Sequence, residues 1–153
     1  MDKIKLFFIF LIINLGSLAI GSWLMNDGPT SEWYMNLYQA PWTPPSWVFG
    51  TAWTIIMICF SIYLTYLLPK LNFRRFKMLY GAQIILNVSW NYIFFNQHLV
   101  FLGLINLILL ISLIAYLYMA YKPHLKSKSN FILPYFLWLC VAISLNLYIF
   151  VHN

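Results

Sequence analysis

Residues 99–121 read LVFLGLINLILLISLIAYLYMAY and contain no charged side chain. A stretch of about 20 mostly apolar residues is long enough to cross a bilayer as a helix. Further stretches of this kind lie near residues 4–24, 46–68, 76–96 and 131–151. In lipid only helices and closed barrels satisfy every backbone group, and these stretches are too long and too uniformly apolar for barrel strands. We therefore predict an all-α integral membrane protein.

The composition supports this fold class. The chain of 153 residues is 63% hydrophobic and only 8% charged, which is too apolar for a soluble domain of this size. The apolar stretches use nearly the whole chain and leave no room for a second domain. We predict a single domain over residues 1–153, a bundle of five transmembrane helices in contact with the lipid bilayer.

The basic residues predict the topology of this bundle. All of them fall at or before the start of the first apolar stretch, around the junction of the second and third, or between the fourth and fifth, and the other connections contain none. Positive charge beside a span stays on the cytoplasmic side, so the N-terminus should lie inside and the C-terminus outside. The net charge of +6 does not indicate a nucleic-acid partner, because the basic residues lie beside apolar stretches at three separate junctions.

Residues 1–22 have an alternative interpretation as a cleaved signal peptide, with small residues near 17–21 marking the cleavage site. The apolar stretch is long for a signal peptide, however, and it carries Asn14 and a small-residue spacing that lets helices approach closely. We predict that it remains as the first span.

Residues 25–45 form an outer connection that is rich in aromatic residues and Pro and is long for a helix connection. Thr30 or Ser31 could cap a short helix running through Gln39, and Thr43 could cap the second span with Pro44 at its first position. The aromatic residues of this connection fit two roles equally, a lid over the bundle or an interfacial aromatic belt. They are Trp33, Tyr34, Tyr38 and Trp42.

Polar residues inside the apolar stretches indicate an internal site. Gln83, Asn87 and Asn91 share one helix face with large aromatic rings, and Trp138 and Asn146 share another. Polar groups within a membrane usually face the bundle interior, either as contacts between helices or as site residues. Carboxamides interleaved with large rings are typical of an apolar pocket with a few orienting groups.

The same stretches exclude conventional catalysis. Their central parts hold no Lys, Arg, Asp, Glu or His, so no general acid–base pair can form there. His98, His124 and His152 lie at membrane edges, and Cys59 and Cys140 lie apart in two different spans. We expect neither a metal site nor a disulfide.

Three groups of residues, in order along the chain, are similar to the motifs of one known family. They are WY at 33–34 with APWTPP at 40–45, Phe49 and Trp53; Gln83, Leu86, Asn87, Trp90, Phe94 and Phe95; and Pro134, Tyr135, Trp138, Ala142, Leu145 and Asn146. The chain therefore resembles the TspO/MBR family of translocator proteins, or tryptophan-rich sensory proteins, whose mammalian member was called the peripheral benzodiazepine receptor.

The resemblance implies a five-helix bundle, commonly a homodimer, with a ligand cavity near its outer half that the first loop covers. The family's ligands are porphyrins, including protoporphyrin IX and haem, together with sterols in animal members and isoquinoline or benzodiazepine drugs. No cofactor is required besides a porphyrin bound as ligand. By position, the ligand-binding residues would be Trp33, Tyr34, Trp53, Asn87, Trp90, Phe94, Trp138 and Ala142.

Some bacterial relatives degrade porphyrin in light, and the resemblance gives Trp53 and Trp138 this photochemical, catalytic role. The sterol motif of animal members is incomplete, because no Lys or Arg follows Tyr148. Many relatives also have an Asp in the fourth span where this chain has Asn106.

The prediction from sequence is a porphyrin-binding membrane protein of the TspO family, acting in tetrapyrrole or stress homeostasis. Two alternatives stay open, a transporter of porphyrin or a similar metabolite and a light-dependent porphyrin-degrading enzyme. A transporter typically shows internal repeats and broken helices, and these stretches show neither. The topology fits a bacterial inner membrane, with a mitochondrial outer membrane as the alternative.

Overall fold

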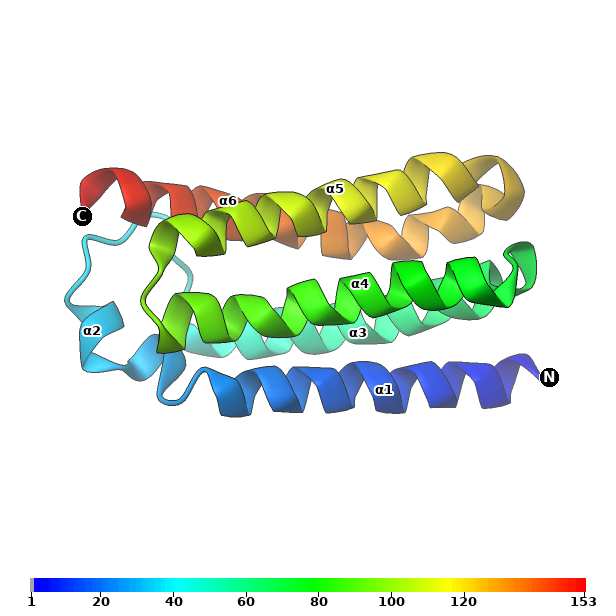
Figure 1. Ribbon diagram of the computed structural model, residues 1–153, viewed down its shortest axis with the longest axis horizontal. Coiled ribbons are helices and arrows are strands. Elements are labelled where there is room, and N and C mark those ends of the chain that lie inside the picture. Colours follow the sequence, from blue (N-terminus) through cyan, green and yellow to red (C-terminus); the bar gives the residue numbers. More distant parts are fainter. Residues whose placement is uncertain (1) are drawn as a thin grey trace.

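The computed structural model describes residues 2–153, and these form an all-helical bundle without a strand (Figure 1). Its long helices are α1 (Lys3–Leu24), α3 (Ser46–Leu67), α4 (Phe73–Asn91), α5 (Val100–Leu125) and α6 (Leu133–His152). Shorter elements are η1 (Gly28–Thr30), α2 (Glu32–Met35), η2 (Leu68–Lys70), η3 (Tyr92–Asn96) and η4 (Lys126–Ile132). The prediction of an all-α fold is confirmed.

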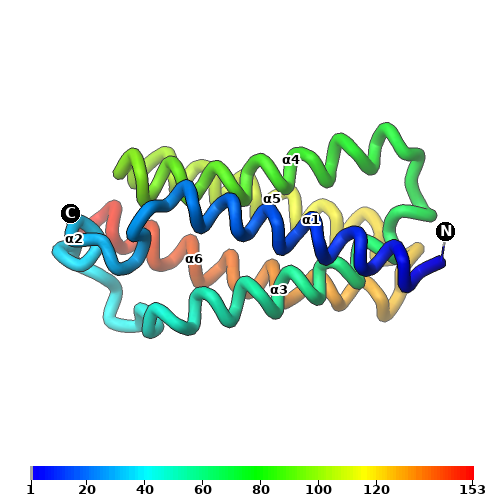
Figure 2. Tube along the Cα trace, turned by 90° about the horizontal axis from the view of Figure 1, so that it is seen from below, coloured from blue at the N-terminus to red at the C-terminus, as the bar shows by residue number. Residues whose placement is uncertain are grey.

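The long helices run side by side, and the two chain ends lie at opposite ends of the bundle (Figure 1). Helix α1 packs against α3 and α4, which lie on either side of it in Figure 2. Helix α5 packs against α4 and, most extensively, against α6. Helix α2 and the loop around it cover the end of the bundle where the chain finishes (Figure 1).

Three parts of the described chain are long and apolar enough to cross a membrane: Lys3–Thr30, Ser46–Lys70 and Val100–His152. The third part contains both α5 and α6, which form an antiparallel pair (Figure 1). Helix α4 is not among them, because its first turns are basic and one of its faces carries carboxamides.

The basic residues gather at one end of the bundle. The start of α1, the connection from α3 to α4 and the connection from α5 to α6 all lie at the end where the chain begins (Figure 1). The acidic residues at the opposite end are Glu32, which begins α2, and Asp27, which precedes η1. The alternation along the chain of connections with and without basic residues therefore gathers the basic residues at one end of the folded bundle.

One predicted helix cap and one predicted helix start differ from the structure. The prediction that Thr43 caps the second span is wrong, since α3 begins at Ser46 and residues 43–45 are not helical. The reason is the Pro44-Pro45 pair, because a residue that precedes a proline is disfavoured in the helical region. Helix α4 begins earlier than expected, because the Asn72 side chain accepts a hydrogen bond from the Arg75 amide at 2.8 Å.

The outer connection also folds differently from the prediction. Ser31 caps α2 by accepting a hydrogen bond from the Tyr34 amide at 3.2 Å, but the helix ends at Met35 and does not reach Gln39. The chain beyond it runs without regular structure to Ala40, where Pro41 follows. Within this connection the α-helical part is therefore a single turn, α2, preceded by the short element η1.

Asn14 lies at the centre of a buried polar network between three helices. Its Nδ2 donates to the Ser61 hydroxyl of α3 at 2.9 Å, and its Oδ1 accepts from the Tyr80 hydroxyl of α4 at 2.8 Å. Asn14 is fully buried. The rings of Phe10 and Phe60 pack against Tyr80 around this network. The network fixes α1 against α3 and α4 just below the cavities described next.

Candidate functional site

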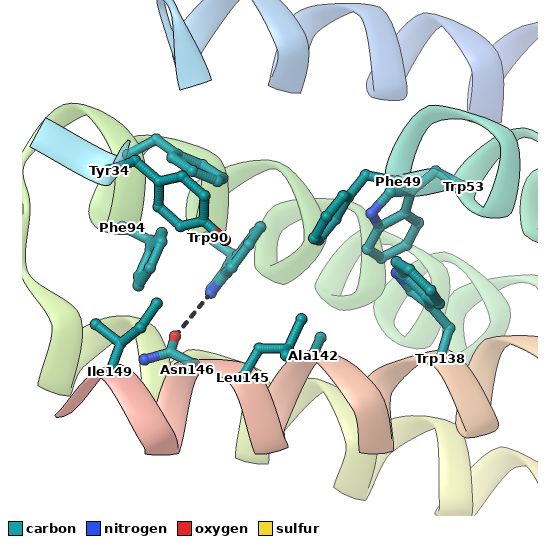
Figure 3. Close-up of a pocket in the computed structure, with 11 residues that line it drawn as sticks. Tyr34, Phe49, Trp53, Trp90, Phe94, Trp138, Ala142, Leu145, Asn146 and Ile149 are labelled. Carbon is teal, nitrogen blue, oxygen red and sulfur yellow. Dashed lines mark hydrogen bonds between the residues drawn. The ribbon is translucent and has the colours of Figure 1, made fainter. Parts of the chain in front are cut away.

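An apolar cavity lies between α3, α6 and the region where α4 continues into η3, and α2 closes it from outside (Figure 3). Most of the side chains around it are aromatic. The lining residues are Tyr34, Phe49, Trp53, Trp90, Phe94, Phe95, Trp138, Ala142, Leu145, Asn146 and Ile149. We call this space the aromatic cavity.

Two indoles form one side of the aromatic cavity. Trp53 comes from α3 and Trp138 from α6, and both lie on the same side with Phe49 beside them (Figure 3). The Phe49 ring meets Trp138 edge to face at 5.6 Å, and Trp53 meets Tyr135 edge to face at 5.7 Å. These contacts hold each indole against a neighbouring ring and leave part of its surface toward the cavity.

The other side of the cavity depends on a change of helix type. Residues of η3 form a π-helix that continues α4. This wider turn places both Phe94 and Phe95 inside the bundle, with exposed fractions of 2% and 6%. Phe94 stacks on Trp90 at 5.2 Å with an angle of 11° between the rings. Single-turn π-helices within α-helices often occur at functional sites.

Asn146 provides the polar group of this side. Its Oδ1 accepts a hydrogen bond from the Trp90 indole N–H at 3.3 Å, and its Nδ2 donates to the Val100 carbonyl at 3.0 Å (Figure 3). Gly103 of α5 allows this close approach, since a Cβ there would lie 3.2 Å from Asn146 Oδ1 and 3.3 Å from Phe94. Asn146 thus fixes the orientation of the Trp90 ring and links α6 to the start of α5.

A second cavity adjoins the first between α1, α3 and α4, and it is more polar. It is lined by Ser17, Leu18, Ser22, Met25, Pro29, Phe49, Gly50, Trp53, Thr54, Asn87, Trp90, Asn91 and Phe95. The Asn87 side chain is 5% exposed, and its amide makes no hydrogen bond within residues 2–153. The amide of Asn87 is therefore free to bind a group placed in this polar cavity.

Tyr34 and Trp33 of α2 have different positions. Tyr34 lines the aromatic cavity and is buried against Phe94 and Phe95. Burial raises the pKa of its hydroxyl, so the group remains a neutral hydrogen-bond donor at physiological pH. Trp33 lines neither cavity and instead stacks on His98 at 4.0 Å with an angle of 9° between the rings.

The rest of the outer connection is fastened to α6. The Tyr38 amide donates to Asn153 Oδ1 at 2.9 Å, and Asn153 Nδ2 donates back to the Tyr38 carbonyl at 3.2 Å. The Trp42 indole N–H donates to the Ser144 hydroxyl at 3.1 Å. Tyr38 and Trp42 are themselves exposed, with fractions of 74% and 56%. Tyr34 thus has the position expected of a lid residue, whereas Tyr38 and Trp42 have that expected of an aromatic belt.

Both cavities are narrow. The aromatic cavity has a volume of about 20 Å³, which is room for about one water molecule. The polar cavity has a volume of about 180 Å³. Sites for drug-sized molecules usually span about 300–1,000 Å³. A larger ligand would need the rings that line both cavities to move, and these are Phe49, Trp53, Trp90 and Phe95.

The structure brings most of the predicted ligand-binding residues together. Tyr34, Trp53, Trp90, Phe94, Trp138 and Ala142 line the aromatic cavity, and Asn87 lines the polar one. Trp33 lines neither cavity but packs on His98 and against the cavity residue Phe94. The prediction did not include Phe49, Phe95, Leu145 or Asn146, although they stand in the same motif segments. The helical spacing of Asn146 from Trp138 and Ala142 was the signal that could have included it. The contribution of α1 through Ser17 and Ser22 had no comparable signal.

The chemistry available at the site is stacking, apolar burial and hydrogen bonding to neutral groups. No Lys, Arg, Asp, Glu or His lines either cavity in the described part of the chain. Residues 2–153 also contain no group of His, Cys, Asp and Glu able to hold a metal ion. The arrangement suits a flat, largely apolar molecule with a few polar groups.

Comparison with known proteins relates this chain to a single family. Residues 8–152 match the sequence profile of the TspO/MBR family. The tryptophan-rich protein TspO of Archaeoglobus fulgidus is 32% identical over 79% of this chain and 80% of its own length. Protein CrtK of Rhodobacter capsulatus is 31% identical over 74% of each chain. The translocator protein of Ovis aries is 28% identical over 78% of this chain and 73% of its own length.

Proposed function

Because this integral membrane protein belongs to the TspO/MBR family, we propose that it binds a porphyrin in the aromatic cavity and takes part in tetrapyrrole or stress homeostasis. The observation that carries the proposal is the set of three indoles, Trp53, Trp90 and Trp138, around one apolar, uncharged cavity. Indole faces can stack on a flat macrocycle, and aromatic contacts of this kind are worth about 0.5–1.5 kcal/mol each beyond burial.

In the proposed complex the macrocycle would separate the rings shared by the two cavities and join the cavities into one site. Asn87 and Tyr34 would then offer neutral hydrogen bonds to the polar groups of the ligand. A covered site of this kind opens by movement of its lid, so access would require α2 to move away from Phe94 and Phe95.

The experiment that tests this proposal is a titration of the purified protein with protoporphyrin IX in an uncharged detergent. We expect a saturable shift of the porphyrin absorbance and quenching of tryptophan fluorescence, both stable in the dark. Absence of saturable quenching would overturn the proposal. Movement of the bound porphyrin across vesicle membranes that contain the protein would instead identify a transporter.

Light-dependent degradation of porphyrin is a second candidate function, favoured by the position of Trp53 and Trp138 on the same side of the cavity. An indole can donate one electron to a photoexcited porphyrin, which leaves an oxidised indole and a reduced macrocycle. Loss of porphyrin absorbance under illumination, absent in the dark, would support this activity.

The proposed topology has five spans, with the N-terminus in the cytoplasm of a bacterial cell and the C-terminus outside. The separation of all basic residues to one end of the bundle supports it. Cysteines introduced one at a time at Asp27 and Ser127, in a chain lacking Cys59 and Cys140, should react with an impermeant reagent from opposite sides of the membrane. Labelling of both from the same side would contradict the five-span topology.

The backbone determines the choice of these two positions. Their neighbours Asn26 and Lys126 both have a φ of 53°, a conformation that is costly for residues with a side chain other than Asn or Asp. Asp27 and Ser127 are exposed, and replacing Ser by Cys changes only one atom.

A homodimer, which the family resemblance implies, would be tested in the same preparations by the mass of the protein in detergent.

We expect porphyrin affinity to depend little on salt, although the ligand carries two propionates. The basic residues lie at the other end of the bundle, and the charged residues near the lid are Asp27 and Glu32. Ion pairs at the surface would be screened over about 8 Å at physiological ionic strength. Titrations at low and high salt should therefore agree within about twofold. A loss of about tenfold, or 1.4 kcal/mol, would indicate a cationic site elsewhere.

A further inference from the structure

A groove lies on the outer surface of the bundle between α1 and α3, near the end where the chain begins. Its volume is about 220 Å³, and it is lined by Lys3, Ile4, Phe7, Ile62, Thr65 and Tyr66. Apart from Lys3 and the Thr65 and Tyr66 hydroxyls, the lining is apolar. On the outer surface of a membrane bundle, such a groove faces the acyl chains of the lipid.

Two lysines lie beside the ring of Tyr66, one of the residues that line this groove. The Nζ atoms of Lys3 and Lys128 lie 5.0 and 5.4 Å from the centre of the Tyr66 ring. The two ammonium groups are therefore no more than about 10 Å apart. Both side chains are exposed, so both ammonium groups are available to an anion beside the Tyr66 ring.

No carboxylate of the described residues fills that position. Asp2 is the one acidic residue at this end of the chain, and its side chain accepts a hydrogen bond from the Ile4 amide at 3.3 Å. Asp27 and Glu32 lie at the far end of the bundle (Figure 1). The pair of lysines thus offers a site for an anion from outside the chain.

The fold brings Lys128 to this place by an unusual turn. Lys126 ends α5 with φ 53° and ψ −128°, a backbone conformation that costs about 1–3 kcal/mol for a residue other than Gly. The Ser129 hydroxyl donates to the Lys126 carbonyl and supports the turn. The chain then continues as η4, which packs against α3 and so carries Lys128 over Tyr66.

We propose that this groove binds an anionic phospholipid, with one acyl chain along Ile4, Phe7 and Ile62 and the phosphate between Lys3 and Lys128. A phosphodiester accepts hydrogen bonds from ammonium groups. Basic pockets between helices at the cytoplasmic membrane surface bind anionic headgroups. A zwitterionic lipid is a weaker ligand, because its own ammonium group offsets the phosphate charge.

The test is a titration of the full-length protein in uncharged detergent with phosphatidylglycerol or with phosphatidylcholine of the same acyl chains, followed by native mass spectrometry. We expect phosphatidylglycerol to bind at least about tenfold more tightly than phosphatidylcholine. The K3Q/K128Q variant should bind phosphatidylglycerol about tenfold more weakly than the unchanged protein does. The matched control is K77Q/K122Q, in which each lysine removed lies over an aromatic ring without a partner lysine, at 5.0 and 5.1 Å.

A second variant tests the acyl-chain part of the site. Ile62→Trp fills the groove while leaving both lysines in place, and it should also weaken phosphatidylglycerol binding by about tenfold. Equal binding of the two lipids, or equal losses in K3Q/K128Q and K77Q/K122Q, would overturn the proposal. Full affinity in Ile62→Trp, or competition by millimolar inorganic phosphate, would show a free-anion site and overturn it as well.

Discussion

Replacing Trp53 and Trp138 together by Phe should weaken protoporphyrin binding by about tenfold and abolish any light-driven loss of the porphyrin. Phe keeps most of the ring area, but it stacks over a smaller surface, and a loss of about 1.4 kcal/mol across two contacts is within the range of aromatic pairs. Phe also oxidises far less readily than indole, so it cannot supply an electron to the excited macrocycle. Absorbance titrations in the dark and under illumination measure the two effects separately.

The matched control for this variant is Trp23→Phe together with Trp47→Phe. These indoles are exposed, with fractions of 77% and 69%, and neither lines a cavity. The control removes the same number of indoles, so it should retain both affinity and photochemistry. Unchanged porphyrin loss in the variant lacking Trp53 and Trp138 would exclude an indole role, whereas equal effects in both variants would show that the cavity is not the binding site.

Replacing Asn14 by Leu should destabilise the bundle by about 2–3 kcal/mol, the largest stability effect that we expect from a single exchange. The hydroxyl of Tyr80 would lose its hydrogen-bond partner in a buried position, which costs about 1–3 kcal/mol. The contact with Ser61 would be lost too, at about 0.6 kcal/mol for an average bond between membrane helices. Unfolding in mixed micelles, followed by circular dichroism, measures the change.

Two further variants show whether hydrogen bonding causes this loss. Tyr80→Phe in the Asn14→Leu background should recover about 1 kcal/mol, because it removes the unpaired hydroxyl. Asn106→Leu is the matched control, since Asn106 Nδ2 bonds the Ser89 hydroxyl at 2.8 Å while its buried Oδ1 has no partner within residues 2–153. Its effect should be close to zero. Equal losses of stability in Asn14→Leu and Asn106→Leu would show that the change of side-chain shape causes the effect, and not the lost hydrogen bond of Tyr80.

The all-helical fold was predictable because long uncharged stretches leave the backbone no other way to form its hydrogen bonds in lipid. The gathering of basic residues at one end of the bundle was also predictable. Neighbouring spans run antiparallel, so every second connection lies at the same end. Features that depend on local chain chemistry were predicted less well. The Pro44-Pro45 pair prevents the predicted cap at Thr43, and the cap formed by Asn72 moves the start of α4.

Most residues that line the aromatic cavity stand in the sequence motifs. The motifs did not predict that the site is divided into an aromatic and a polar cavity. The π-helix that turns both Phe94 and Phe95 inward has no periodicity of its own in the sequence. Trp33 was expected in the site and instead stacks on His98, whose φ of 57° depends on the connection between η3 and α5. The separate polar cavity exists only because α1 packs beside α3 and α4, a relation that no local pattern encodes.

The paired hydrogen bonds between Tyr38 and Asn153 join the outer connection to the end of α6, and neither residue lines a cavity. Such a fastening does not touch a ligand, so loosening it should speed association and dissociation by the same factor and leave the ratio of the two rate constants unchanged. Residence time and affinity thus become separately adjustable properties of the protein.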